Sequence, residues 1–475
     1  MTDTTPNAPF RKIPSLDSLL REDAVRGLVE EFGRDVVVLD GRAVLDETRA
    51  AIAAANGAAG ADISSESLVT RLRGRLEKKF APSLSPAVNA TGIIMHSGLG
   101  RAVLSEAARE ALGAVAAGYS TLALDLESGK RVSRDRHVEA LLRELTGAEA
   151  ATVANNNAAA TVLILNTLAK GKEVVVSRGQ LVEIGGSFRM PDVMTTSGAV
   201  LREVGTTNKT HLRDYEGVLN ESTGAILRVH HSNYRIVGFA EEPGIEELAV
   251  LGRSRGVPVV DDLGSGALVD LAPYGLAAEP MVRASVQAGA DVVCFSGDKL
   301  IGGPQCGIIV GKAAWIQKIK KNPLARAFRC GKLSLAALEA TLKLFLAPEK
   351  LAARHPIYRM LGLTTDELGR RAKKLASSLR KALAQGIMIS VEDGESQVGS
   401  GAVPVETLPS KVLAVQAPGI SSEDLARKLR LLTPPIFARI HKDAVLFDFR
   451  TIQPAEDAVV EKALVELLGG GTVPR

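Results

Sequence analysis

The sequence has few cysteines and few aromatic residues. Its three cysteines are Cys294, Cys306 and Cys330, and no two of them form a CxxC pair. So few cysteines exclude a disulfide framework and a cysteine-rich zinc site, and they favour a reducing, cytoplasmic compartment. Phe, Tyr and Trp together make up only 4% of the 475 residues. Aliphatic side chains must therefore fill most of the core.

Long apolar runs and a strong net charge are also absent. No stretch reaches the ~18 uninterrupted apolar residues of a membrane span, and the first residues lack the apolar segment of a signal peptide. The net charge is +4, which argues neither for nor against a nucleic-acid partner. Because 46% of the residues are hydrophobic, the chain can bury a large core. We expect a cytoplasmic protein of about two to four structural units, with no membrane partner and no metal.

The first 80 residues predict a flexible leader followed by a small helical domain. Residues 1–12 are polar and contain proline, whereas apolar residues recur at helical spacing from 13 to 80. Leu68, Leu72 and Leu76 are examples of this spacing. The last ten residues of the segment, 71–80, carry five basic side chains and one acidic one. Taken alone, this basic run is most simply interpreted as the solvated face of a helix.

Residues 81–335 predict a largely parallel α/β domain. Short apolar runs, rich in β-branched residues, alternate here with helical stretches, as in a sheet covered on both faces. We expect seven strands, at 150–154, 173–177, 199–204, 225–231, 257–262, 291–297 and 307–311.

Residues 336–475 predict a smaller α+β domain. We expect helices at about 335–347 and 365–385, and strands at 386–391, 411–417, 436–440 and 444–449. The segment 393–410 is rich in Gly, Ser and Pro, a composition typical of a loop.

A lysine directly after an apolar strand is the most informative single feature. Lys299 lies in a turn of small residues, with Ser296 three positions before it and Gly302-Gly303-Pro304 after it. A surface turn lysine is the simplest interpretation, and S-x-x-K alone is a weak signal. The pattern also suits a lysine that forms a Schiff base with pyridoxal phosphate (PLP), because ligands of open sheets bind at the strand ends. The Ser296 hydroxyl would then reach the cofactor phosphate.

Other polar groups at strand ends match the remaining parts of this cofactor. A carboxylate must hold the pyridine nitrogen protonated, and either Asp261 or Asp262, at the end of one strand, can supply it. Asn233 follows another strand and is a candidate partner of the phenolic oxygen. Asn155, Asn156 and Asn157 lie where a strand is followed by a helix. The N-terminus of that helix could bind the cofactor phosphate, or the asparagines could simply cap the helix. Four such clusters in one sheet make coincidence improbable.

Several longer segments carry a family resemblance. They are residues 88–92, 100–102, 155–160, 177–186, 204–208, 262–266 and 295–305. These segments resemble bacterial selenocysteine synthase, also called L-seryl-tRNA(Sec) selenium transferase, and the similarity extends from about residue 13 to beyond 450. Within it, Lys299 corresponds to the family's Schiff-base lysine.

The resemblance implies a fold, a reaction and partners. It implies a fold-type-I PLP-dependent transferase that converts L-seryl-tRNA(Sec) to L-selenocysteinyl-tRNA(Sec) with selenophosphate. Water would be eliminated from the seryl group and selenium added to an aminoacrylyl intermediate. The resemblance further implies a homo-oligomer, a decamer built from dimers, whose domain 13–80 holds the tRNA. Arg101, Arg326 and Arg329 fall on arginines that bind the selenium donor, as suits guanidinium groups facing an anion. Gln180 falls within one of the resembling segments and joins the expected cofactor-binding residues.

Two positions depart from the family pattern. Gly98 stands where the family usually has asparagine, so a polar contact is lost there, and Cys330-Gly331 replaces an Ala-Asp-like pair after Arg329. A passive small residue is the simplest interpretation of Cys330.

Two alternative functions are compatible with the sequence, and two further motifs only weakly suggest a dinucleotide site or a metal site. One rival is a PLP-dependent lyase of the same superfamily that acts on a small amino acid or an amino-sugar phosphate. The other is a catalytically inactive RNA-binding relative. The glycine pairs 98/100 and 264/266 lack the third glycine of a dinucleotide fingerprint. His230-His231 has no further ligands in the sequence that would complete a metal site.

Overall fold

The computed structural model describes residues 13–54, 62–184, 188–277 and 279–469, and the predicted leader 1–12 lies outside them. The chain forms two compact units, residues 1–86 and 87–475. Among the described residues, no helix combines the length and the apolar character needed to cross a membrane.

The N-terminal unit is helical, as its apolar spacing predicts. Its helices are α1 (Leu16–Leu20), α2 (Asp23–Phe32), α3 (Arg34–Ala54) and α4 (Ser65–Phe80). Leu68, Leu72 and Leu76 lie one turn apart on α4 and are fully buried against the apolar faces of the other helices. Ser64 caps α4 by accepting a hydrogen bond from the Ser67 amide.

The basic run on α4 mainly holds this helix to α3. The Arg75 Nε donates to Asp40 Oδ1 at 2.8 Å, and Lys79 Nζ donates to Asp40 Oδ2 at 2.5 Å. Arg71 donates to the Thr48 hydroxyl at 2.7 Å. Three of the five cations are therefore committed to contacts with α3, which the interpretation as a purely solvated face does not account for.

The larger unit is built around a seven-stranded sheet with the order β2-β10-β9-β8-β7-β3-β6. The strands are β2 (Ala150–Ala154), β3 (Glu173–Ser177), β6 (Val200–Val204), β7 (Thr223–Val229), β8 (Val259–Gly264), β9 (Val292–Ser296) and β10 (Gly307–Gly311). All seven predicted strands are present. Neighbouring strands are parallel except at β10, which is antiparallel to both β9 and β2.

Helices cover both faces of this sheet because alternate residues of its strands are apolar on each side. One face carries α7 (Asn157–Ala169), α8 (Met190–Thr196) and α12 (Ala313–Lys321). The other carries α6 (Arg136–Thr146), α10 (Ile245–Arg255), α11 (Val282–Gln287) and α14 (Lys332–Leu344). Further helices and two short strands complete this part. The helices are α5 (Glu106–Ala116), α9 (Leu212–Glu216), α13 (Pro323–Ala327), α15 (Leu351–Arg354) and α16 (Pro356–Gly362), and the strands are β4 (Glu183–Ile184) and β5 (Phe188–Arg189).

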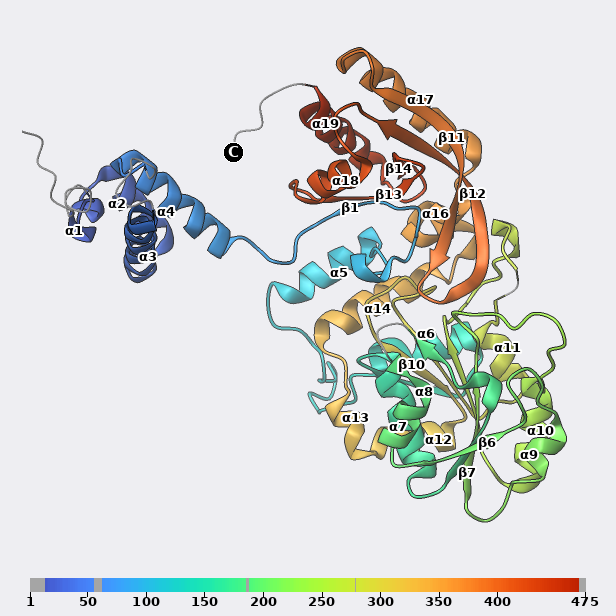
Figure 1. Ribbon diagram of the computed structural model, residues 1–475. Coiled ribbons are helices and arrows are strands. Elements are labelled where there is room, and N and C mark those ends of the chain that lie inside the picture. The colour runs from blue at the N-terminus through green and yellow to red at the C-terminus, as the bar shows by residue number, and fades with distance from the viewer. Residues whose placement is uncertain (1–12, 55–61, 185–187, 278, 470–475) are drawn as a thin grey trace, which may run out of the picture. The chain divides into compact units, whose positions relative to one another are not determined.

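A second sheet of five strands has the order β1-β13-β14-β12-β11. Its strands are β1 (Val88–Ala90), β11 (Met388–Gly399), β12 (Ala402–Gln416), β13 (Ile436–His441) and β14 (Ala444–Asp448). The helices α17 (Thr365–Ala382), α18 (Ser422–Arg430) and α19 (Asp457–Leu468) pack on one face of it (Figure 1). The predicted boundary between residues 335 and 336 falls inside α14, whose buried leucines pack against the large sheet.

The prediction of a loop at 393–410 is wrong, because these residues form most of a long β-hairpin. Strands β11 and β12 pair from Met388–Gln416 to Gly399–Ala402, with one irregularity beside the tip. Figure 1 shows the hairpin curving away from the second sheet. Gly, Ser and Pro lower the intrinsic strand preference of this segment, but continuous pairing between its two arms supplies the backbone hydrogen bonds. Local composition does not reveal such pairing.

Candidate functional site

The predicted Schiff-base lysine is buried at the end of a central strand. Lys299 lies three residues beyond the end of β9 and is 6% exposed. A Cβ atom at Gly264 would lie 3.7 Å from Lys299 Nζ, and Gly264 has a φ of +64°. Burial lowers the pKa of Lys299, and the nearby Arg101 lowers it further, whereas Asp262 acts in the opposite direction. The amine is thus biased toward its neutral, nucleophilic form.

Asp262 is held on the α7 face of the sheet by neutral hydrogen-bond donors. Its two carboxylate oxygens accept from Asn157 Nδ2 at 2.8 Å and from the Thr161 hydroxyl at 2.9 Å. Burial raises the pKa of Asp262, while these hydrogen bonds and Lys299 act to lower it. The carboxylate has no full positive charge within ion-pair distance among the described residues. It is therefore able to stabilise a cationic group of a ligand.

Asp261 points to the opposite face, because successive side chains of a strand alternate. It accepts hydrogen bonds from Arg228 Nη1 at 3.1 Å and from the Ser285 hydroxyl at 2.6 Å. Its side chain is fully buried, and Arg228 supplies a compensating charge. The sequence left the choice between the two aspartates open, and the contacts favour Asp262 as the cofactor's partner.

The three consecutive asparagines at the start of α7 have different contacts. The Asn155 amide donates to the Phe328 carbonyl at 2.7 Å, and Asn156 caps the helix by accepting from the Ala159 amide at 2.8 Å. Asn157 donates to Asp262, but its Oδ1 is buried without a hydrogen-bond partner among the described residues. A 13-residue helix begins here, and its N-terminal amides favour an anion.

The predicted donor-binding arginines fall into two groups. Arg101 Nη1 forms an ion pair with Asp298 Oδ2 at 2.7 Å, directly beside Lys299. Arg329 forms an isolated β-bridge with Ala154, the last residue of β2, shortly before α7 begins. Arg326 lies on the helix that precedes Arg329, α13.

Arg326 and Arg329 belong to a wider cluster of cations. Repulsion from Arg134 and Arg326 lowers the pKa of Arg329, and Arg131 adds to the effect. Arg134 also donates to the Cys330 carbonyl at 2.8 Å. None of these four arginines has a carboxylate within 4 Å in the described part of the chain. A cluster of unpaired guanidinium groups suits a small, multiply charged anion.

Cys330, next to these arginines, is a packing residue. Its side chain is buried, and its thiol donates to the Ala154 carbonyl at 3.1 Å. Burial raises its pKa to about 11, which makes the reactive thiolate scarce at neutral pH.

Three further predicted cofactor ligands lie at this end of the sheet with other contacts. Gln180 is buried, donates to Glu242 at 3.0 Å and accepts from the Val229 amide at 3.0 Å. Asn233 is exposed and donates to the Glu183 carbonyl at 2.8 Å. Ser296, the last residue of β9, is buried. Their roles toward a cofactor stay predictions.

Sequence reasoning missed two residues that shape the site. Thr161 reaches Asp262 because it lies one helical turn after Asn157 on α7, a spacing visible in the sequence. Asp298 directly precedes Lys299 and pairs with Arg101, but its partner is distant along the chain, so no local signal identifies it. In the described residues, no group of three or more His, Cys, Asp or Glu side chains is arranged to hold a metal ion.

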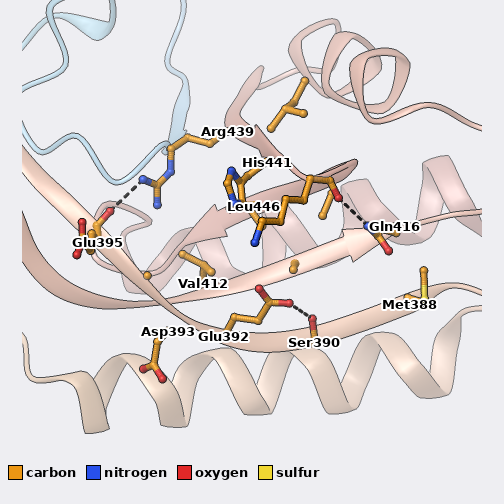
Figure 2. Close-up of a pocket in the computed structure, with 15 residues that line it drawn as sticks. Met388, Ser390, Glu392, Asp393, Glu395, Val412, Gln416, Arg439, His441 and Leu446 are labelled. Atoms are coloured by element: carbon orange, nitrogen blue, oxygen red, sulfur yellow. Dashed lines mark hydrogen bonds between the residues drawn. The ribbon is translucent and has the colours of Figure 1, made fainter.

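A hollow of about 720 Å³ lies elsewhere, on the second sheet. Figure 2 shows its lining from β11, β12, β13 and β14, including Glu392, Gln416 and His441. None of the predicted site residues borders it. The candidate catalytic and cofactor-binding residues therefore lie away from this hollow, around Lys299 at the end of the large sheet.

Comparison with known families decides among the alternatives. A family model described as L-seryl-tRNA selenium transferase matches residues 87–453, and another described as selenocysteine synthase N terminal matches residues 10–49. The chain belongs to the L-seryl-tRNA selenium transferase family. The predicted family resemblance is thereby confirmed.

Individual relatives within this family extend over nearly the whole chain. The chain is 48% identical to the L-seryl-tRNA(Sec) selenium transferase of Alkaliphilus metalliredigens over 455 residues, covering 95% of this chain and 97% of that protein. It is 47% identical over 471 residues to the enzyme of that name from Nitratidesulfovibrio vulgaris, covering 98% and 100%.

A solved structure supports the predicted fold class. D-glucosaminate-6-phosphate ammonia-lyase is similar with a TM-score of 0.56 at 20% identity, covering 82% of this chain and 97% of that one. Together with the mixed seven-stranded sheet and the second, smaller sheet, this similarity confirms the fold-type-I architecture. At this level of identity the likeness concerns the fold alone.

Proposed function

We propose that this chain transfers selenium from selenophosphate to L-seryl-tRNA(Sec), forming L-selenocysteinyl-tRNA(Sec) with PLP as cofactor. Membership of the L-seryl-tRNA selenium transferase family carries the proposal. The buried Lys299–Asp262 arrangement supports it, because the residues needed for such chemistry are present at one strand end. The proposed setting is the cytoplasm, where charged tRNAs occur and where buried free cysteines such as Cys294 stay reduced.

The polar groups around Lys299 fit PLP. The amine has a lowered pKa, as a Schiff-base lysine requires, and a carboxylate without a cationic partner lies nearby. The N-terminal backbone amides of α7 suit the cofactor phosphate. When bound, PLP supplies an electron sink for the bond that breaks at the seryl Cα.

The residues of the chain then perform distinct tasks. Lys299, biased toward its neutral form, accepts the proton from the seryl Cα. Asp262 keeps the ring nitrogen protonated, with its orientation fixed by Asn157 and Thr161. Arg101, Arg326 and Arg329 bind the selenium donor through charge-assisted hydrogen bonds.

The N-terminal unit is proposed to hold the tRNA, in a homo-oligomer that is a decamer built from dimers. The second family model, which matches residues 10–49, supports the role of this unit. Since Arg71, Arg75 and Lys79 are committed to α3, we assign RNA contacts to cations outside these pairs. Lys78, exposed on α4, has no carboxylate partner among the described residues and is one such cation.

Selenium transfer to charged tRNA(Sec) tests the reaction directly. Purified protein should form selenocysteinyl-tRNA(Sec) only when seryl-tRNA(Sec), selenophosphate and PLP are all present. Elimination from a small amino acid or an amino-sugar phosphate, with no reaction on the tRNA, would support the rival lyase instead.

A truncation tests the role of the N-terminal unit. A variant lacking residues 1–86 should keep its PLP absorbance, because every proposed cofactor ligand lies between Asn155 and Lys299. It should lose tRNA affinity, and the affinity of the full-length protein should fall with increasing salt. Full tRNA affinity in the truncated, cofactor-loaded protein would contradict this assignment.

A further inference from the structure

A histidine–glutamate pair with a buried carboxylate lies at the same end of the large sheet as Lys299. His230 directly follows β7, and its backbone amide donates to the Asp262 carbonyl at 2.9 Å. Its Nε2 lies 3.4 Å from Glu279 Oε1, and the Glu279 side chain is 4% exposed. Both atoms are buried, and neither makes a hydrogen bond within the described ranges. Buried polar atoms without hydrogen bonds are rare, so this pair requires an explanation.

The glutamate is held from its other side by the long hairpin. Its Oε2 accepts a hydrogen bond from the Val403 amide at 3.3 Å, at the tip between β11 and β12. Val403 has a φ of +48°, a conformation that β-branched residues rarely adopt. Such strain persists only where the surrounding contacts enforce it, and it occurs often at functional sites.

The pair borders a cavity and is close to Lys299. His230 and Glu279 line a hollow of about 400 Å³ at this end of the sheet. Ser232 lies two residues after His230. A Cβ atom placed on Gly264 would lie 3.7 Å from the Ser232 Cβ and also 3.7 Å from Lys299 Nζ. Glu279 also acts on the pKa of Lys299, in the direction opposite to burial. The Glu279 carboxylate therefore lies within electrostatic range of the amine, at the strand ends where His230 also lies.

The adjacent histidine has a different environment. His231 Nε2 is bonded to the Gly179 carbonyl at 2.9 Å, and its ring packs edge-on against Tyr234 at 4.8 Å. No carboxylate pairs with it in the described part of the chain. The two histidines, equivalent in the sequence, are thus separated by their contacts, and only His230 forms a carboxylate–imidazole pair.

We propose that His230, oriented by Glu279, is the acid that protonates the seryl hydroxyl as it leaves. The inference rests on the proposed function, in which the seryl Cβ–O bond must break. Hydroxide is a poor leaving group, so a proton donor at this oxygen lowers the barrier. A carboxylate beside one ring nitrogen restricts the orientation of the imidazole and leaves the other nitrogen for the substrate.

The proton transfers balance with two separate groups. Lys299 takes the Cα proton, while the imidazolium of His230 gives its proton to the hydroxyl oxygen. The Cβ–O bond breaks with its electron pair on oxygen, and water departs. Solvent then returns a proton to the neutral imidazole, and Lys299 returns its own proton to Cα when selenium bonds to Cβ. The P–Se bond of the donor breaks by hydrolysis, which releases phosphate. Glu279 stays ionised throughout, consistent with its lowered pKa, to which His230 and Ser265 contribute against the effect of burial.

A change of leaving group tests this role. Single-turnover elimination is measured with seryl-tRNA(Sec) and with 3-chloroalanyl-tRNA(Sec), whose chloride leaves without a proton. His230→Gln should slow the reaction of the seryl substrate by about 10²–10⁴-fold and that of the chloro substrate by less than about threefold. Glu279→Gln, which leaves the imidazole in place, should show the same selectivity with a smaller loss.

A second histidine–glutamate pair supplies the matched control. His211 Nδ1 lies 3.3 Å from Glu241 Oε1, but this pair is half-exposed. His211→Gln should react like the wild type with both substrates. PLP absorbance verifies the fold of every variant.

Each other outcome is informative. Equal slowing of both substrates by His230→Gln and Glu279→Gln would assign the pair a structural role and overturn the inference. Wild-type rates on the seryl substrate in both variants would do the same. A wild-type enzyme that eliminates from neither tRNA would instead contradict the proposed function.

Discussion

Two buried carboxylates, Asp262 in the large sheet and Asp40 in the N-terminal unit, have opposite electrostatic surroundings. Asp40 is paired with Arg75 and Lys79, and although burial acts to raise its pKa, these cations hold it below the usual value. Asp262 is held by neutral donors, and burial raises its pKa. A carboxylate neutralised by its own chain stabilises the scaffold, whereas one without a cationic partner is free to stabilise a ligand.

The largest expected effect is at Lys299. Lys299→Ala should reduce selenium transfer by at least about 10³-fold, because the residue both holds the cofactor and moves the Cα proton. Folding should be little changed, since the variant removes a buried amine with a lowered pKa. The measurement is activity together with circular dichroism, and Lys312→Ala, at a peripheral ion pair with Asp291, is the control.

Borohydride reduction of the loaded wild-type protein checks the same assignment independently. Peptide mapping should find the cofactor attached to Lys299. A label on any other lysine would contradict the proposed site.

The next effect separates the two adjacent aspartates. Asp262→Asn should lower kcat by about 10²-fold and shift the cofactor absorbance, because the ring nitrogen loses its carboxylate. Asp261→Asn should mainly lower stability, since it removes the nearer of the two carboxylates that pair with the partly buried Arg228. Activity and absorbance spectra are compared with thermal unfolding for both variants. The opposite pattern would identify Asp261 as the partner of the cofactor.

A smaller effect is expected at the arginine cluster. Arg329→Ala should raise the KM for selenophosphate about tenfold or more, with little change in PLP binding, because a charge-assisted contact to the donor is lost. Steady-state kinetics with varied selenophosphate measure it. Arg136→Ala, at a surface pair with Asp125, is the control. Saturation like that of the wild type would assign Arg329 another role.

The sequence predicted the sheet and its lysine but not the contacts across the fold. Strands β2, β3 and β10 begin and end where their apolar runs do, since buried parallel strands are continuously apolar. The hairpin at 393–410 was missed because pairing, not composition, stabilises it. The choice between Asp261 and Asp262 depends on which face each side chain occupies, and His230 meets Glu279 only through the tertiary fold.

The smallest expected effect is at Asp40. Asp40→Asn removes the charge that attracts Arg75 and Lys79, and should destabilise the packing of α3 on α4 by about 1–3 kcal/mol at neutral pH. Hydrogen exchange of the α3 and α4 amides in the full-length protein reports this local loss. Asp46→Asn, at an exposed pair with Arg49, is the matched control and should change exchange little.

The pH dependence gives the sharper form of this last prediction. The pKa of Asp40 is lowered in the folded state, so its stabilising effect is fully present above the unfolded pKa of about 3.9 and is lost as pH falls through the folded value. The difference in exchange between wild type and Asp40→Asn should therefore be largest near pH 7 and shrink below about pH 4. A difference that is independent of pH would mean that Asp40 acts through packing and not through its charge, and the contrast with Asp262 would then not be one of electrostatics.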